Sequence, residues 1–203
     1  MLSSASQMRS IRFSSIQTIL FLLTLAGVCP PLATQAQGGY NGAYKPLLTG
    51  LSASTIGGVN VDIAGNVFVA DSGGNRVVEL PANGGAQITL GSGLSGPGQA
   101  AVDSEGNLYI ADTGNNRIGE LPWTGSGYGD QITLPAVGLN TPGDVQVDGA
   151  GDVFIADCKN NRVVELPAGG GAQITVPVTG MKWPAGLGLD AAGDLFIADQ
   201  PNS

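Results

Sequence analysis

Aspartates recur at regular intervals along the chain, and they are the first residues that could do chemistry. One set occupies the same position in four similar segments of the sequence and consists of Asp62, Asp103, Asp148 and Asp190. Consecutive members of this set are 41, 45 and 42 residues apart. Carboxylates brought together around an axis could hold a hard cation such as Ca²⁺, which prefers oxygen ligands. Each of them also precedes a glycine by three residues, and Asp first with Gly fourth is typical of a type I turn. We favour the turn role, with a metal site at these four aspartates as the alternative.

A second set of aspartates is followed by an arginine five residues later. The pairs are Asp71 with Arg76, Asp112 with Arg117, and Asp157 with Arg162. A charge-assisted hydrogen bond between the two side chains would fix the turn that they flank. Because the same pair recurs in every complete copy, whereas a binding site is usually asymmetric, we interpret these residues as structural.

Positions that differ between the copies are better candidates for a binding site. Trp123 and Tyr128 lie in a connection that is longer than its counterparts. Lys159 and Asn160 replace small residues in a turn, and Trp183 lies in a later connection. Exposed aromatic side chains can anchor peptides or sugars, although they also pack within loops. The topology expected below places Trp123 and Tyr128 at one end of the sheets, and Lys159 and Trp183 at the other.

The composition excludes several kinds of chemistry. The 203 residues include no histidine, so no mechanism that needs an imidazole base or ligand is available to this chain. The formal net charge of −8 argues against nucleic acid as a partner, because that affinity depends on Lys and Arg. With 33 Gly and 12 Pro, the sequence favours short strands joined by tight turns over helices. We expect no cofactor.

Each copy contains four short runs of strand-forming residues separated by Gly, Pro, Asn or Asp. In the first copy the second run, Val67 to Ala70, is continuously apolar, as expected for a strand buried on both faces. Pro81 ends the third run, since proline cannot donate to a β-ladder. Four strands with short turns in a unit of about 40 residues are typical of a β-propeller blade. The predicted blades span 58–90, 99–134, 144–176 and, incompletely, 186–203.

The repeated motif resembles the NHL-repeat family of β-propellers. Its elements in the first copy are Val61-Asp62, Gly65-Asn66 with a following Ala70-Asp71, and Asn75-Arg76-Val77. The resemblance implies an all-β propeller of NHL type, here incomplete, with three full four-stranded blades and partial blades at both ends. Residues 37–57 are expected to be a lead-in that contains the outer strand of a preceding blade. Open blade edges would also allow self-association.

The first 36 residues have the three parts of a secretory signal peptide. Arg9 and Arg12 precede an apolar run over 19–28, and small residues lead to a cleavage site after Ala36. An uncleaved anchor is the alternative. Cleavage would remove two arginines and no acid, which leaves a charge of 6 − 16 = −10. We therefore expect a secreted or periplasmic protein that has no membrane segment after cleavage.

Two classes of function remain after these exclusions. The favoured one is a non-catalytic binding or scaffold module for a protein, a peptide or a cell-envelope glycan. The alternative is a propeller enzyme, similar to lyases or gluconolactonases, that uses axial carboxylates and a divalent cation. Cys158 stands where the neighbouring copies have Ser72 and Thr113, so we interpret its thiol as structural and inert.

Overall fold

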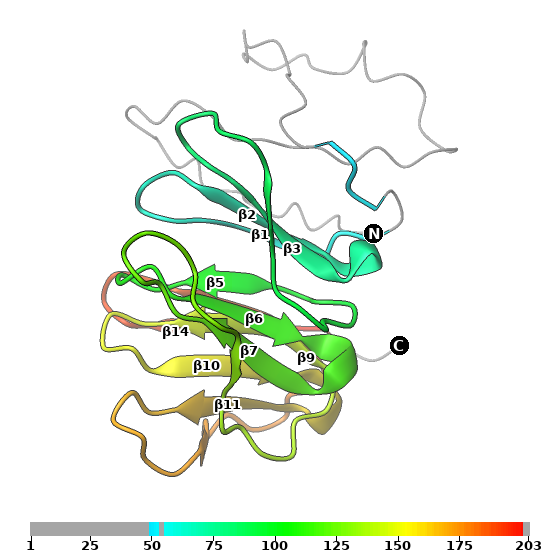
Figure 1. Ribbon diagram of the computed structural model, residues 1–203. Coiled ribbons are helices and arrows are strands. Elements are labelled where there is room, and N and C mark those ends of the chain that lie inside the picture. The colour runs from blue at the N-terminus through cyan, green and yellow to red at the C-terminus, as the bar shows by residue number, and fades with distance from the viewer. Residues whose placement is uncertain (1–48, 53–54, 201–203) are drawn as a thin grey trace, which may run out of the picture.

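The computed structural model describes residues 49–52 and 55–200, and this part of the chain folds as a row of antiparallel β-sheets (Figure 1). The first sheet contains β1 (Val59–Val61), β2 (Val67–Asp71), β3 (Arg76–Leu80) and β4 (Ile88–Leu90). The second contains β5 (Ala100–Val102), β6 (Leu108–Asp112), β7 (Arg117–Leu121) and β8 (Ile132–Thr133). The third contains β9 (Pro142–Val147), β10 (Val153–Asp157), β11 (Arg162–Leu166) and β12 (Ile174–Thr175). A half-sheet follows with β13 (Pro184–Leu189) and β14 (Leu195–Asp199).

Every four-stranded sheet runs up and down in chain order. In the first sheet Val69 of β2 is paired with Val59 on one side and with Val78 on the other. The second strand of each complete sheet is the most buried, because it lies between two partners and its apolar residues are covered on both faces. This arrangement confirms the predicted all-β fold, with three complete blades and a partial one.

Short 3-10 turns join the second and third strands of each complete sheet. These turns are η2 (Ser72–Gly74), η3 (Thr113–Asn115) and η4 (Cys158–Asn160). Each ends at an asparagine in the left-handed conformation, with φ values of 53° to 54° at Asn75, Asn116 and Asn161. Asparagine tolerates this region better than most residues, which explains the Asn-Arg step of the motif. The 3-10 turns lie together at one end of the sheets (Figure 1).

Consecutive sheets pack face against face, and this packing forms the core. Phe68 of β2 is fully buried in one cluster with Ala100, Leu108 and Ile110 of the second sheet. Ala111 and Ile118 of the second sheet share the next cluster with residues of the third, among them Val145 and Ile155. Apolar side chains removed from water between two sheets supply most of the stabilisation. The stack is therefore a propeller arc in which each blade covers its neighbour.

Cys158 occupies the same place between two sheets as its counterparts. Its Sγ lies 2.9 Å from the carbonyl oxygen of Pro184, and Thr113 Oγ1 lies 2.7 Å from that of Pro142. Burial raises the pKa of the Cys158 thiol, which disfavours the reactive thiolate. The thiol thus acts as a small donor to the next sheet.

Several predictions fall on residues outside the described part of the chain. These are the signal peptide at 1–36, with its cleavage or retention, and the outer strand of a preceding blade before residue 49. Between residues 49 and 200, leaving aside 53–54, none of the helices has the length and apolar character needed to span a bilayer.

Candidate functional site

The first set of aspartates holds the turn between the first and second strands of each blade. Asp62 accepts hydrogen bonds from the backbone N–H and the side-chain Nδ2 of Asn66, at 2.8 and 2.7 Å. The Asn66 Oδ1 in turn accepts from the N–H of Ala82, at 2.9 Å, which ties the turn to the end of β3. Gly65 has a φ of 87°, a conformation that glycine adopts without strain.

The same arrangement recurs at the other three members of this set. Asp103 bonds to Asn107, while Asp148 and Asp190 accept from the backbone N–H of Asp152 and Asp194. No group of three or more His, Cys, Asp or Glu that could hold a metal occurs in the part of the chain that the structure describes. Each carboxylate in the set thus has hydrogen-bond partners within its own turn.

The second set of aspartates joins three segments of chain at the opposite end of each blade. Asp112 is fully buried, and its Oδ2 accepts from Arg117 Nε at 2.7 Å and from Asn115 Nδ2 at 2.8 Å. Its Oδ1 accepts from the N–H of Ser95 at 2.7 Å, in the loop that enters the sheet. Arg117 also donates to the carbonyl of Gly93 in that loop. We call this arrangement the carboxylate clamp.

The clamp is repeated in the other complete blades. Arg76 Nε lies 2.9 Å from Asp71 Oδ2, and Arg162 Nε lies 2.7 Å from Asp157 Oδ2. In the half-sheet Asp199 accepts from the N–H of Trp183 at 2.7 Å. The recurring position explains why the sequence keeps an aspartate there in all four copies: it fastens the incoming loop to the end of the second strand.

Trp123 and Tyr128 form a compact aromatic pair at the end of the second blade that lies away from the clamps. Their ring centroids are 5.2 Å apart with an interplanar angle of 70°, an edge-to-face contact, and their backbones form an isolated β-bridge. The N–H of Trp123 donates to Asn107 Oδ1 at 2.8 Å. Trp123 remains 42% exposed, while Tyr128 packs on the cluster between the first two sheets. The loop therefore leaves part of the Trp123 indole exposed beside a tyrosine that is packed against the core.

Acidic side chains lie within electrostatic reach of Tyr128. Burial, followed by the charges of Glu79, Asp62 and Asp103, raises the pKa of Tyr128. Burial also raises the pKa of Glu79, with Asp62 adding to the shift. The pKa of Glu120 is raised in the same way, by burial first and by Asp103 second. We call Trp123, Tyr128, Glu79, Asp103 and Glu120 the aromatic-acidic patch.

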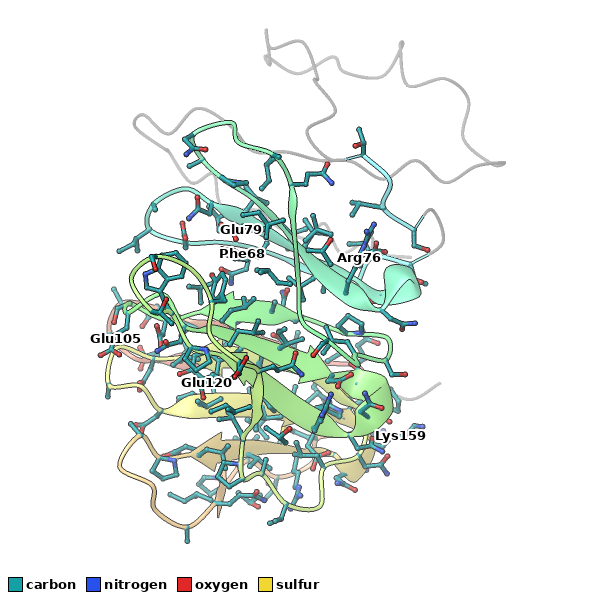
Figure 2. The ribbon with its side chains drawn as sticks, in the orientation of Figure 1. Phe68, Arg76, Glu79, Glu105, Glu120 and Lys159 are labelled. Carbon is teal, nitrogen blue, oxygen red and sulfur yellow. The ribbon has the colours of Figure 1, made fainter. Side chains whose placement is uncertain are left out.

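The remaining binding candidates lie elsewhere. Figure 2 shows Lys159 at the clamp end of the sheets, opposite Glu105 in a turn at the patch end. Asn160 donates its side-chain amide to Gly138 O and to Asp157 Oδ2, both at 2.8 Å, so it belongs to a clamp. Trp183 follows the same pattern through its backbone bond to Asp199. The structure thus brings together Trp123 and Tyr128 and places the other three at the opposite end.

The structure shows roles for two kinds of residue that the sequence analysis did not predict. Gln131 bonds both the N–H and the carbonyl of Ser92, at 2.9 and 3.2 Å, and Gln173 makes the same pair of bonds to Val137. These glutamines fasten the outer strand of one blade to the residues that follow the previous blade. The other kind is the glutamate of each third strand, represented in the patch by Glu79. Both the glutamine and the glutamate recur at the same position of successive repeats, and this recurrence is the feature of the sequence that could have indicated their roles.

Comparison with known proteins identifies one repeat and a set of structures with a similar fold. The NHL repeat family matches residues 94–121, which cover most of the second blade. A comparison with curated protein sequences gives no match.

Among solved structures, the fold is similar to a chain of a nidogen/laminin complex, with a TM-score of 0.61 and 20% identity over 71% of this chain and 56% of that one. It is also similar to a gluconolactonase from Xanthomonas campestris, with a TM-score of 0.58 and 20% identity over 70% and 52% of the two chains. A third similar structure is virginiamycin B lyase from Staphylococcus aureus, with a TM-score of 0.56 and 18% identity over 71% of this chain and 48% of that one.

The chain spans about half the length of the solved structures that it matches. Those structures include enzymes and a protein complex, and at these identities the likeness shows the fold alone. The four-stranded sheets and their face-to-face packing show that the described residues form three complete blades and half of another blade of a β-propeller. The second of these blades matches the NHL repeat.

Proposed function

We propose that this propeller segment is a non-catalytic binding module that works outside the cytoplasm and recognises a protein or peptide through the aromatic-acidic patch. The observation that carries the proposal is the 42% exposed indole of Trp123, which contacts Tyr128 edge to face, while Glu79 and Asp103 act electrostatically on Tyr128. An indole face attracts cations, and negatively charged groups in the same region add to that attraction. The preferred partner is therefore a segment that presents Arg or Lys side chains.

The chain's own residues support binding over catalysis. It contains no histidine, whereas a histidine-to-alanine variant of virginiamycin B lyase, solved with quinupristin, is described as catalytically inactive. The aspartates offered for an axial metal are engaged in their own turns. Placement outside the cytoplasm rests on the signal-like segment at 1–36, where a charged start, an apolar run and small residues occur in the order of a secretory leader.

Binding at the patch is tested by calorimetry with short acetylated peptides rich in Arg, in Lys or in Glu, and with chitin oligosaccharides. We expect the Arg and Lys peptides to bind and the Glu peptides not to bind. Trp123→Ala should weaken binding by about tenfold or more, as for an aromatic anchor. Trp183→Ala is the matched control, because it removes the other tryptophan at the opposite end of the sheets.

Four results would contradict the proposal. Equal losses in the two tryptophan variants, or the absence of peptide binding, would remove the patch as the site. Saturable heat with Ca²⁺ that Asp103→Asn abolishes would favour the metal-dependent enzyme class. Binding of the oligosaccharides instead of the peptides would reassign the partner to a glycan.

A further inference from the structure

Glu79 on β3 is more buried than the glutamates at the same position of the other complete blades. It is 8% exposed, whereas Glu120 and Glu165 are only partly buried. Its register partners are Phe68 on β2 and Ile88 on β4, and paired residues of an antiparallel sheet project from the same face. Figure 2 shows Glu79 and Phe68 on the first sheet. Because Phe68 belongs to the cluster between the first two sheets, this face is turned toward the second blade.

The burial of Glu79 coincides with the aromatic loop of the second blade. Tyr128 of that loop packs on the same cluster as Phe68, and the charge of Glu79 acts on Tyr128. In the third blade the corresponding connection, 168–172, contains only glycine and alanine, and Glu120 of the second blade is less buried. The longer loop thus accompanies a glutamate that is almost withdrawn from solvent.

The carboxylate of Glu79 has neither a hydrogen-bond donor nor a cation as a partner among the described residues. The ion pairs in this part of the chain use Asp71, Asp112 and Asp157 instead. No side-chain oxygen there is both closed off from solvent and without a partner, so the Glu79 oxygens keep some contact with water. Burial, followed by the charge of Asp62, raises the pKa of Glu79. A cation that reached this carboxylate would therefore stabilise its ionised form.

We propose that Glu79 is the residue of the aromatic-acidic patch that accepts the ammonium or guanidinium group of the partner, and that it releases its proton when that group arrives. This inference rests on the proposed function, because it assigns a role to one residue of the same site. The partner's cation supplies the donor that Glu79 lacks within the fold. The exposed side chain of Ile88 beside it offers an apolar surface to the stem of a Lys or Arg side chain.

Binding of this kind depends on pH in a defined direction. The charged groups that act on Glu79 and Tyr128 from the neighbouring turns are Asp62 and Asp103, and both are acidic. In the free protein Glu79 holds a proton at pH values where a glutamate with the ordinary pKa of 4.5 is ionised. An incoming cation favours the ionised form and lowers this pKa again. Binding therefore releases a proton, and it weakens as the pH falls through the raised value.

The test is calorimetry on the full chain with the acetylated Lys-rich peptide, in two buffers that differ in their heat of ionisation. Near the raised pKa the wild type should release up to about half a proton per peptide, and Glu79→Gln should lose this release. At neutral pH the same variant should bind the peptide about tenfold more weakly, because it lacks a charge-assisted hydrogen bond. Glu165→Gln is the matched control at the same repeat position of the third blade, and it should behave as the wild type does.

Unfolding in urea tests the unpaired carboxylate without any peptide. Because the pKa of Glu79 is raised in the folded chain, the wild type should lose stability relative to Glu79→Gln as the pH rises from 4.5 through the raised value. A Glu79→Gln variant that is less stable than the wild type at neutral pH would mean that the carboxylate has a partner within the fold.

The inference is overturned if Glu79→Gln binds the peptide as tightly as the wild type, if the wild type binds it without releasing a proton, or if the two glutamine variants lose affinity equally. In these three cases the peptide still binds, so the proposed function survives the failure of this inference. A wild type that does not bind the peptide at all overturns both. Circular dichroism establishes that both variants retain the sheet fold before their affinities are compared.

Discussion

Replacing Phe68 by alanine is expected to lower the free energy of unfolding by about 3–5 kcal/mol. Phe68 is fully buried between the first and second sheets, beside Leu108 and Ile110. The substitution removes apolar surface from that contact and leaves a cavity whose walls belong to two different sheets, so they cannot close on it easily. Urea unfolding followed by circular dichroism measures the loss.

Phe196→Ala is the matched control, because it makes the same chemical change at the same repeat position on an exposed surface. The control should cost less than about 1 kcal/mol, as is usual for surface positions. Equal losses in the two variants would mean that the sheets do not cover Phe68 as the fold requires.

Removing the carboxylate of Asp112 is expected to be nearly as costly, at about 3–5 kcal/mol for Asp112→Ala. This carboxylate is fully buried and accepts from Arg117, Asn115 and Ser95, so alanine leaves a guanidinium and a backbone N–H without their acceptor. Chemical unfolding gives the loss, and a double-mutant cycle with Arg117→Ala gives the coupling between the two charges.

Asp199→Ala serves as the comparison for the clamp. Asp199 holds the entering loop of the half-sheet through the N–H groups of Lys182 and Trp183, but it is exposed. Because water can replace those bonds, this variant should lose about 1 kcal/mol or less. A loss in Asp112→Ala as small as that in Asp199→Ala would show that the clamp contributes little to the fold.

Most of the fold could be predicted because the sequence contains several copies of one repeat. The interval between Asp62 and Asp103, the apolar run of the second strand and the Asn75-Arg76 step are local signals that are set by turn geometry and by burial. The pairing of Asp71 with Arg76 follows from five residues that span one turn. Each of these features depends on residues that are close together in the sequence, so each can be recognised from the pattern that the repeats share.

Contacts between blades were harder to predict, because they join residues about one repeat apart. The double bond from Gln131 to Ser92 spans 39 residues, and nothing in the local sequence names its partner. The acidic surroundings of Tyr128 likewise arise from two sheets, with Glu79 on one and Asp103 on the next. Such sites can be identified only when it is known which residues of neighbouring sheets lie next to each other.

The central claim is that consecutive copies pack face against face, and proton–proton contacts measured by NMR test it most directly. In the isotope-labelled chain, the ring protons of Phe68 should show nuclear Overhauser effects to methyl groups of Leu108 or Ile110, across the junction between the first two sheets. Effects that connect the Phe68 ring only to residues of its own sheet would contradict the propeller stack.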